Sequence, residues 1–180
     1  MPRYIAFLRA INVGGHTVKM DRLRGLFESM GFAKVETFIA SGNVLFDAAT
    51  RKTGPLERTI EAALQAALGY EVATFIRTPA EVDAIAARRP FADYDPAAKD
   101  GLYVAFVKSA LGEGAWRAVR ALRNAVDDIH HEGREVYWLR RRRVGESEFT
   151  GALLERAIGG PATMRNLTTV EKLAGKWARE

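Results

Sequence analysis

The stretch YIAFLRA at residues 4–10 is matched, position by position, by the stretch YVAFVKS at residues 103–109. In both stretches consecutive residues are apolar, which is typical of a β-strand that is buried on both faces. The two stretches are offset by 99 residues, so the pattern that begins at Tyr4 begins again at Tyr103. This repetition predicts a chain built from two similar halves, each opened by a buried strand.

Outward from the first stretch, apolar spacing and turn residues indicate the order β-α-β-β-α-β within residues 1–78. That order is the ferredoxin-like arrangement. The expected elements are a strand at 4–11, a helix around 23–30, strands at 35–40 and 44–46, a helix at 55–68 and a strand at 72–77.

Residues 79–101 are expected to form a connector. The sequence Thr78-Pro79-Ala80-Glu81 is a capping box that opens a helix, and Pro90 to Gly101 has the composition of a loop. Residues 102–180 then repeat the first order and add a C-terminal helix, with Thr168 as its expected cap. The predicted fold class is therefore α+β: two ferredoxin-like halves related by internal duplication, with a connector helix and a C-terminal helix.

The composition excludes several kinds of chemistry. The 180 residues include no Cys and 3 His, which excludes thiolate catalysis, disulfides and cysteine-based metal sites. The common nucleotide-binding and hydrolase motifs are absent, so we predict no metal, no cofactor and no particular catalytic residue. No apolar run is long enough to span a bilayer and the N-terminus lacks a cleavage pattern, so we expect a cytoplasmic protein without membrane association.

The net charge of +5 is spread along the chain, as +3 over residues 1–90 and +2 over residues 91–180. Neither a basic tail nor an acidic block is present, so the excess charge alone indicates a solvated surface rather than a nucleic-acid footprint.

The first candidate site follows from the expected topology. In an antiparallel β-α-β-β-α-β unit, the loop at 12–16 and the turn at 41–43 meet at one end of the sheet. A glycine pair lets backbone N–H groups approach a phosphate, and an arginine on an apolar strand needs an anionic partner. The alternative is structural: the glycines only permit positive φ, and Arg9 forms an ion pair within the protein. The candidate ligand-binding residues are Arg9, Asn12, Gly14, Gly15, His16, Lys19, Ser41, Gly42 and Asn43.

The second candidate site lies at the opposite end of the second half. The run Arg140–Arg143 ends an expected strand, so alternate guanidinium groups would point to opposite faces and could grip phosphates. The alternative is a solvated strand end, with Ser147 acting as the N-cap of the next helix. The residues of this second candidate site are Arg143, Gly145, Ser147, Arg165 and Asn166.

Five blocks of the sequence carry a likeness to a known family: FLRAINVGG at 7–15, VKM at 18–20, ASGNVLF at 40–46, REVY at 134–137 and PATMRNLTTV at 161–170. They resemble the signature blocks of a widespread bacterial family, catalogued as domain of unknown function 1697. The resemblance spans essentially the whole chain and implies two α+β halves. It supplies no activity, cofactor or partner.

The chain departs from that family's usual pattern at several positions. Ala10 stands where the family more usually has glycine, Leu167 replaces a frequent tryptophan, and Glu148 stands where lysine is frequent. The residues 141–143 lie where the family tends to a Pro-Asp turn. The arginine run is therefore particular to this chain, which favours the first candidate site over the second.

We therefore expect a binding module for a small anionic or phosphate-bearing ligand at the Gly14-Gly15 and Ser41–Asn43 end. One alternative is an RNA- or DNA-binding protein that uses Arg140–Arg143. Another is an enzyme of unidentified reaction class, in which His16 is the first residue to test. A purely structural or oligomeric role is the fourth, and the sequence does not determine the oligomeric state.

Overall fold

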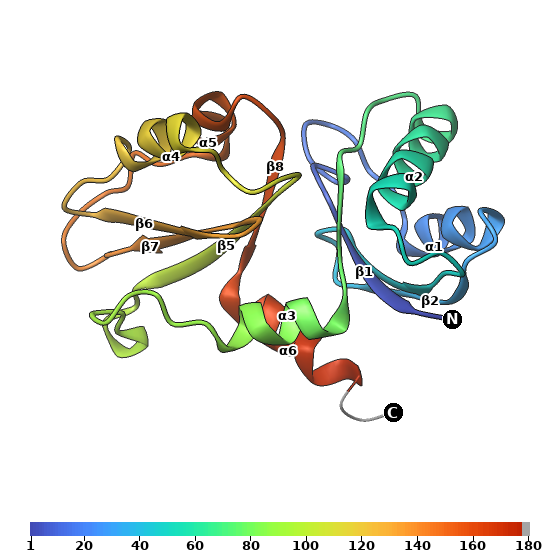
Figure 1. Ribbon diagram of the computed structural model, residues 1–180, viewed down its shortest axis with the longest axis horizontal. Coiled ribbons are helices and arrows are strands. Elements are labelled where there is room, and N and C mark those ends of the chain that lie inside the picture. Colours follow the sequence, from blue (N-terminus) through green and yellow to red (C-terminus); the bar gives the residue numbers. More distant parts are fainter. Residues whose placement is uncertain (178–180) are drawn as a thin grey trace. The chain divides into compact units, whose positions relative to one another are not determined.

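The structure is a computed structural model that describes residues 1–177. The described chain divides into two compact units: residues 1–83 together with Trp177, and residues 84–176. In each unit, two helices cover one face of a four-stranded sheet (Figure 1). The described chain is thus a mixed α+β protein with two antiparallel sheets and six α-helices.

The first unit has the predicted element order. Its strands lie in the spatial order β2-β3-β1-β4, and all neighbouring strands are antiparallel. Because β1 is central, its C-terminal end, the β2–β3 turn and the α2–β4 connection lie at one end of the sheet. The elements are β1 (Arg3–Leu8), α1 (Met20–Ser29), β2 (Ala33–Phe38), β3 (Asn43–Asp47), α2 (Thr53–Leu68) and β4 (Thr74–Arg77).

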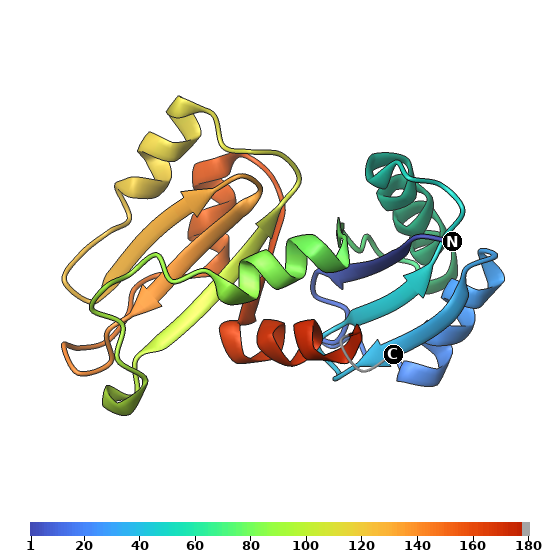
Figure 2. The same ribbon diagram turned by 60° about the horizontal axis from the view of Figure 1, so that its bottom comes forward.

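The second unit repeats this order, and its strands lie in the matching spatial order β6-β7-β5-β8 (Figure 2). All neighbouring strands are again antiparallel. The elements are β5 (Gly101–Val107), α4 (Glu113–Arg120), β6 (Asp127–Glu132), β7 (Glu135–Arg140), α5 (Gly151–Ile158) and β8 (Ala162–Asn166).

Three further elements flank these repeats: α3 (Pro79–Ala87), a short 3₁₀ helix η1 (Pro96–Ala98) and the C-terminal helix α6 (Leu167–Trp177). The predicted capping box opens α3, because Glu81 accepts the Thr78 N–H at 2.7 Å and the Thr78 hydroxyl oxygen accepts the Glu81 N–H at 3.3 Å. Within residues 1–177, no helix combines the length and the apolar character needed to cross a membrane.

Each unit has its core between the sheet and its helices. In the first unit Tyr4, Ala6 and Leu8 face this core, together with side chains of α1 and α2. Ala105 and Val107 hold the same places in the second unit. The intervening residues of β1 and β5 are buried as well, as the apolar pattern of these strands predicts.

Helix carboxylates cover the outer edge of the last strand in each unit. The Glu57 carboxylate accepts the Ile76 N–H at 2.9 Å, and the Glu155 carboxylate accepts the Ala162 N–H at 3.0 Å. These bonds occupy N–H groups of edge strands β4 and β8, which would otherwise be available to pair with another strand.

Several expected boundaries differ from the structure by a few residues, among them the end of the first strand and the start of the last helix. The first strand ends at Leu8 rather than at residue 11, and Ala10 beyond it adopts a φ of +54°, in the left-handed region rather than the extended one. The last helix begins at Leu167, directly after β8, so Thr168 lies inside its first turn and is not its cap.

Candidate functional site

The loop of residues 9–19 joins β1 to α1, and the side chain of Asn12 closes it. The Asn12 amide oxygen accepts the Val18 N–H at 2.6 Å, across the loop. The Asn12 amide nitrogen donates to the Ala40 carbonyl at 2.9 Å, in the β2–β3 connection. The structure therefore brings together the two loops that the topology places at one end of the sheet, and Asn12 is the residue that joins them.

The turn between β2 and β3 packs tightly against the end of β1. Gly42 has a φ of +82°, and a Cβ atom there would lie 2.6 Å from Ile11 Cγ2. Asn43 is fully buried, and its amide nitrogen donates to the Phe38 carbonyl at 2.9 Å and to the Ser41 hydroxyl at 3.0 Å. Gly42 and Asn43 thus hold the turn in place, and of the three turn residues Ser41 is the exposed one.

Gly14 and Gly15 form the exposed tip of the first loop. Their φ angles are +64° and +84°, and no other atom lies within 4 Å of where a Cβ would stand at either residue. Left-handed backbone of this kind favours glycine, and it lets backbone N–H groups face an anion without a side chain in the way. This tip is exposed, together with Val13, His16 and Thr17 on either side of it.

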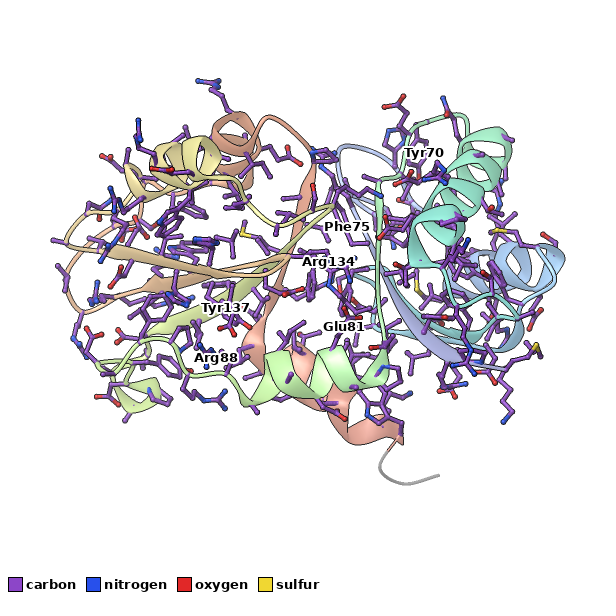
Figure 3. The ribbon with its side chains drawn as sticks, in the orientation of Figure 1. Tyr70, Phe75, Glu81, Arg88, Arg134 and Tyr137 are labelled. Atoms are coloured by element: carbon purple, nitrogen blue, oxygen red, sulfur yellow. The ribbon has the colours of Figure 1, made fainter. Side chains whose placement is uncertain are left out.

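An aromatic residue that the sequence did not single out supports this tip. Tyr70 lies between α2 and β4 (Figure 3), and its ring stacks on the His16 imidazole with centroids 3.7 Å apart. The Tyr70 hydroxyl donates to the Ile11 carbonyl at 3.2 Å. The topology that joins the other two loops also places residues 69–73 at this end, and Tyr70 is the aromatic residue of that segment.

Two cations belong to the same loop. Arg9 is half-buried, and its backbone N–H donates to the Ala73 carbonyl at 2.9 Å. It follows the end of β1 instead of lying within the strand as predicted. Lys19 is exposed and is the N-cap residue of α1, where no side chain caps the free N–H groups of the helix. Asp21 in the first turn has an exposed carboxylate that pairs with Arg24 at 3.5 Å.

The matching end of the second unit has a different form. Its loop of residues 108–112 is five residues long, and with Ala115 and residues 158–161 it lines an open cavity of about 390 Å³. Lys108 follows β5 as Arg9 follows β1, and it is the charged residue of the cavity lining. The hairpin turn here is formed by Gly133 and Arg134, and the Arg134 carbonyl accepts the Val107 N–H at 3.1 Å.

The arginine run at the other end of the second unit is held by ion pairs. β7 ends at Arg140, so the alternation expected for a strand does not extend to Arg141, Arg142 and Arg143. Arg141 pairs with Asp93 at 2.7 Å, and this hydrogen bond lowers the pKa of the Asp93 carboxyl and raises that of the Arg141 guanidinium.

The other three arginines of the run also have intramolecular partners. The guanidinium groups of Arg140 and Arg143 pair with Glu146 and Asp100, each at 3.3 Å. The Arg142 guanidinium donates to the Tyr103 hydroxyl at 3.4 Å. These contacts fix the turn after β7 to its surroundings.

Ser147 is not the helix cap that the sequence predicts. Thr150 caps α5, and its hydroxyl oxygen accepts the Leu153 N–H at 3.2 Å. The Ser147 hydroxyl instead donates to the buried Asp127 carboxylate at 2.6 Å. The same carboxylate oxygen accepts the Trp138 indole N–H at 2.8 Å, so Asp127 is the centre of this network.

The remaining residues of the second candidate site lie in different surroundings. Arg165 is buried, and it donates to the Thr163 hydroxyl at 2.8 Å and to the Met164 carbonyl at 2.9 Å. Burial lowers the pKa of the Arg165 guanidinium to about 10. Asn166 and Gly145 are exposed. The structure therefore divides this set into a buried arginine, a half-buried hydroxyl bonded to a buried carboxylate, and two exposed residues.

Histidines do not form a metal centre in the described chain. The ring centroids of His130 and Tyr137 are 6.3 Å apart, whereas that of His131 lies 4.3 Å from the ring of Trp116. The two imidazoles thus contact different rings, as their alternation on a strand predicts. Among residues 1–177, no three His, Asp or Glu side chains are grouped as metal ligands would be.

Comparison with known proteins gives a family and a fold. Residues 1–137 match the model of a family described as "Protein of unknown function (DUF1697)". A solved structure of a conserved bacterial protein from Streptococcus pneumoniae aligns with 100% of this chain and 99% of its own, with a TM-score of 0.73 and 21% sequence identity. At this identity the likeness shows the fold alone. No curated protein matches the chain.

Proposed function

The chain belongs to the DUF1697 family of proteins of unknown function, and we propose that it is a binding module for a small anionic ligand. The binding site is the end of the first unit at which the loop of residues 9–19 meets the turn at Ser41. The ligand carries a phosphate or carboxylate group, which the backbone at Gly14 and Gly15 receives.

The observation that carries this proposal is the exposed pair of left-handed glycines at the tip of a clamped loop. Asn12 holds the base of the loop at two points, and Tyr70 supports its far side through His16. The loop is therefore ordered around an open tip, which is the arrangement that a backbone anion site requires.

Charge around the tip favours an anion. Lys19 stands at the uncapped N-terminus of α1, where the partial positive charge of the helix adds to that of the ammonium group. Arg9 adds a second cation at the other end of the loop. Asp21 carries the opposing charge, and its carboxylate pairs with Arg24.

We also infer that the two units are ferredoxin-like and arose by internal duplication. Three features support this origin: the shared element order, the shared strand order and the sequence match at an offset of 99. A buried arginine adds a fourth. Arg77 lies opposite Ile5, and Arg165 lies opposite Val104, which is Ile5 displaced by the same 99 residues.

Fewer structural observations support the other functions that the sequence suggests. Each residue of Arg140–Arg143 has an intramolecular partner, which supplies a structural role for the run. An enzymatic role, a structural or oligomeric role and a cytoplasmic location stay predictions from the sequence.

A thermal-shift titration of the full chain with inorganic phosphate and with a hexose phosphate tests the proposal. A ligand held at about 100 times its dissociation constant adds about 2.7 kcal/mol to the free energy of unfolding. Lys19→Ala should weaken binding about tenfold, because it removes a charge-assisted contact.

Lys52→Ala is the matched control. Lys52 is also an exposed N-cap lysine without a side-chain cap, but it precedes α2, after the opposite end of β3. The control should bind like the parent protein. No shift with either ligand, or equal weakening by the two substitutions, contradicts the proposal.

A further inference from the structure

A shallow depression on the second unit is lined entirely by charged and amide side chains. It occupies about 610 Å³ between the end of α4, the following loop, β6 and the turn after β7. Figure 1 shows the α4–β6 loop and the turn after β7 at the same end of the sheet. The lining residues, which we call the arginine depression, are Arg120, Arg123, Asn124, Asp128 and Arg141.

One carboxylate orients two of the three arginines. Asp128 contacts Arg123 through Oδ1 and Nε at 2.7 Å, and Arg141 through Oδ2 and a terminal guanidinium nitrogen at 3.1 Å. Asp93 holds the Nε of Arg141 at 2.7 Å. Because the bond to Asp128 uses the Nε of Arg123, its two terminal nitrogens are not committed to that carboxylate. The half-exposed guanidinium of Arg123 is therefore held in place and keeps N–H donors that can bind a ligand.

The third arginine of the depression, Arg120, is available to bind a ligand. Arg120 is exposed, and within residues 1–177 its guanidinium has no ion pair or hydrogen bond. The lining holds three guanidinium groups and one carboxylate, and Asp93 adds a second carboxylate beside Arg141, so the net charge is positive. Guanidinium forks match phosphate oxygens in pairs, so this arrangement is suited to phosphate rather than to a cation.

The side chains of the lining also limit which chemical groups of a ligand the depression can recognise. None of the five lining residues is aromatic or aliphatic, so the arginine depression has no aromatic side chain on which a base could stack and no apolar pocket for the ligand. The charged groups of the ligand are therefore the main feature that the lining can recognise. A ligand that presents phosphates in succession can engage all three arginines, whereas a single phosphate can engage only part of the depression.

We propose that the arginine depression binds a chain of phosphate groups. The chain is either a free polyphosphate or the backbone of a single-stranded nucleic acid, since both present the same repeated charge. This site is separate from the one proposed in the first unit and does not depend on it.

The test is a binding titration of the full chain with linear tripolyphosphate and, separately, with a short labelled oligouridylate. The double variant Arg120→Ala/Arg123→Ala should lose affinity about tenfold or more for the probe that binds. Arg120→Ala alone should lose less, and it is safe for folding because its side chain is exposed and has no partner. Oligouridylate binding should weaken steeply between about 50 mM and about 200 mM salt.

Arg117→Ala is the matched control. Arg117 is exposed on the same helix and pairs with Glu113 at 3.4 Å, outside the depression. The control should bind both probes as the parent does. Binding of tripolyphosphate alone identifies a free polyphosphate as the ligand, and binding of oligouridylate identifies a nucleic-acid backbone.

Two results overturn the proposal: neither probe binds at low salt, or Arg117→Ala weakens binding as much as the double variant. The variant Lys19→Ala separates this site from the one in the first unit. If Lys19→Ala abolishes tripolyphosphate binding and the double variant leaves it intact, the arginine depression is not the site.

Discussion

The loop after β1 and the loop after β5 leave corresponding points of two sheets that have the same strand order, yet they are built differently. The first has eleven residues, a clamp at Asn12 and an exposed tip at Gly14 and Gly15. The second has five residues and lines a cavity with residues 158–161. The sheet thus determines where a strand ends, while loop length and left-handed residues determine what that end presents to a ligand.

The same contrast holds at the hairpin turns, and substitution of their glycines should show the largest effect. Gly42 and Gly133 both have positive φ, at +82° and +56°. A Cβ at Gly42 would lie 2.6 Å from a branched side chain of the first loop, whereas at Gly133 the nearest atom is 3.6 Å away, in the flexible Glu135 carboxylate.

We therefore expect Gly42→Ala to lower the free energy of unfolding by about 2–4 kcal/mol, since it adds a clash to the backbone strain. Gly133→Ala should cost about 1 kcal/mol, from strain alone. Urea unfolding of both variants, followed by circular dichroism, measures the difference. Equal losses would show that Ile11 yields to the new methyl group and that the turn of the first unit is not packed more tightly.

A matched pair in the loops themselves should give effects of opposite sign. Ala10 and Ser109 occupy the same position in the two repeats, but Ala10 has a φ of +54° and Ser109 does not have a positive φ. Ala10→Gly should raise the free energy of unfolding by about 0.5–1 kcal/mol, because glycine adopts the left-handed conformation without strain.

Ser109→Gly should lower the free energy of unfolding by a similar amount, because there the added freedom of glycine only stabilises the unfolded chain. The measurement is the urea midpoint of each variant against the parent. A loss of stability in both would mean that the left-handed conformation at Ala10 carries no strain.

The sequence predicts the arrangement of elements well because that information is local or repeated. The offset of 99 residues between the two YxAF stretches, helical spacing and the capping box at Thr78 together predict the element order, and the structure has it. The topology then predicts which loops meet, and the hydrogen bond from Asn12 to Ala40 joins them.

The details of the sites depend on contacts between residues far apart in the chain, which no local pattern reveals. Tyr70 supports the tip of the first loop from a segment 54 residues beyond His16. Asp128 fixes Arg141 from a neighbouring strand, and a run of four arginines in the sequence does not reveal this contact. The left-handed backbone at Ala10 is equally invisible, since alanine is common in strands and helices alike.

The smallest expected effect concerns a histidine of the second unit. Nδ1 of His131 is buried without a hydrogen-bond partner in the described chain, and the ring lies against Trp116. Burial and, to a lesser degree, the neighbouring His130 lower the pKa of His131 below 6.5 in the folded protein. The unfolded chain therefore takes up this proton first, so the free energy of unfolding falls as the pH decreases through about 6.5.

In the variant His131→Asn this contribution is absent, and the urea midpoint should decrease less between about pH 7.5 and about pH 5.5 than it does in the parent. The measurement compares the change of urea midpoint with pH in the variant and in the parent. The difference between these two slopes removes the contributions of the other titratable groups. Identical slopes would mean that His131 accepts its proton without cost in the folded state. The ring of His131 would then be accessible to water despite its packing against Trp116, as the exposed ring of His16 is despite its stacking on Tyr70.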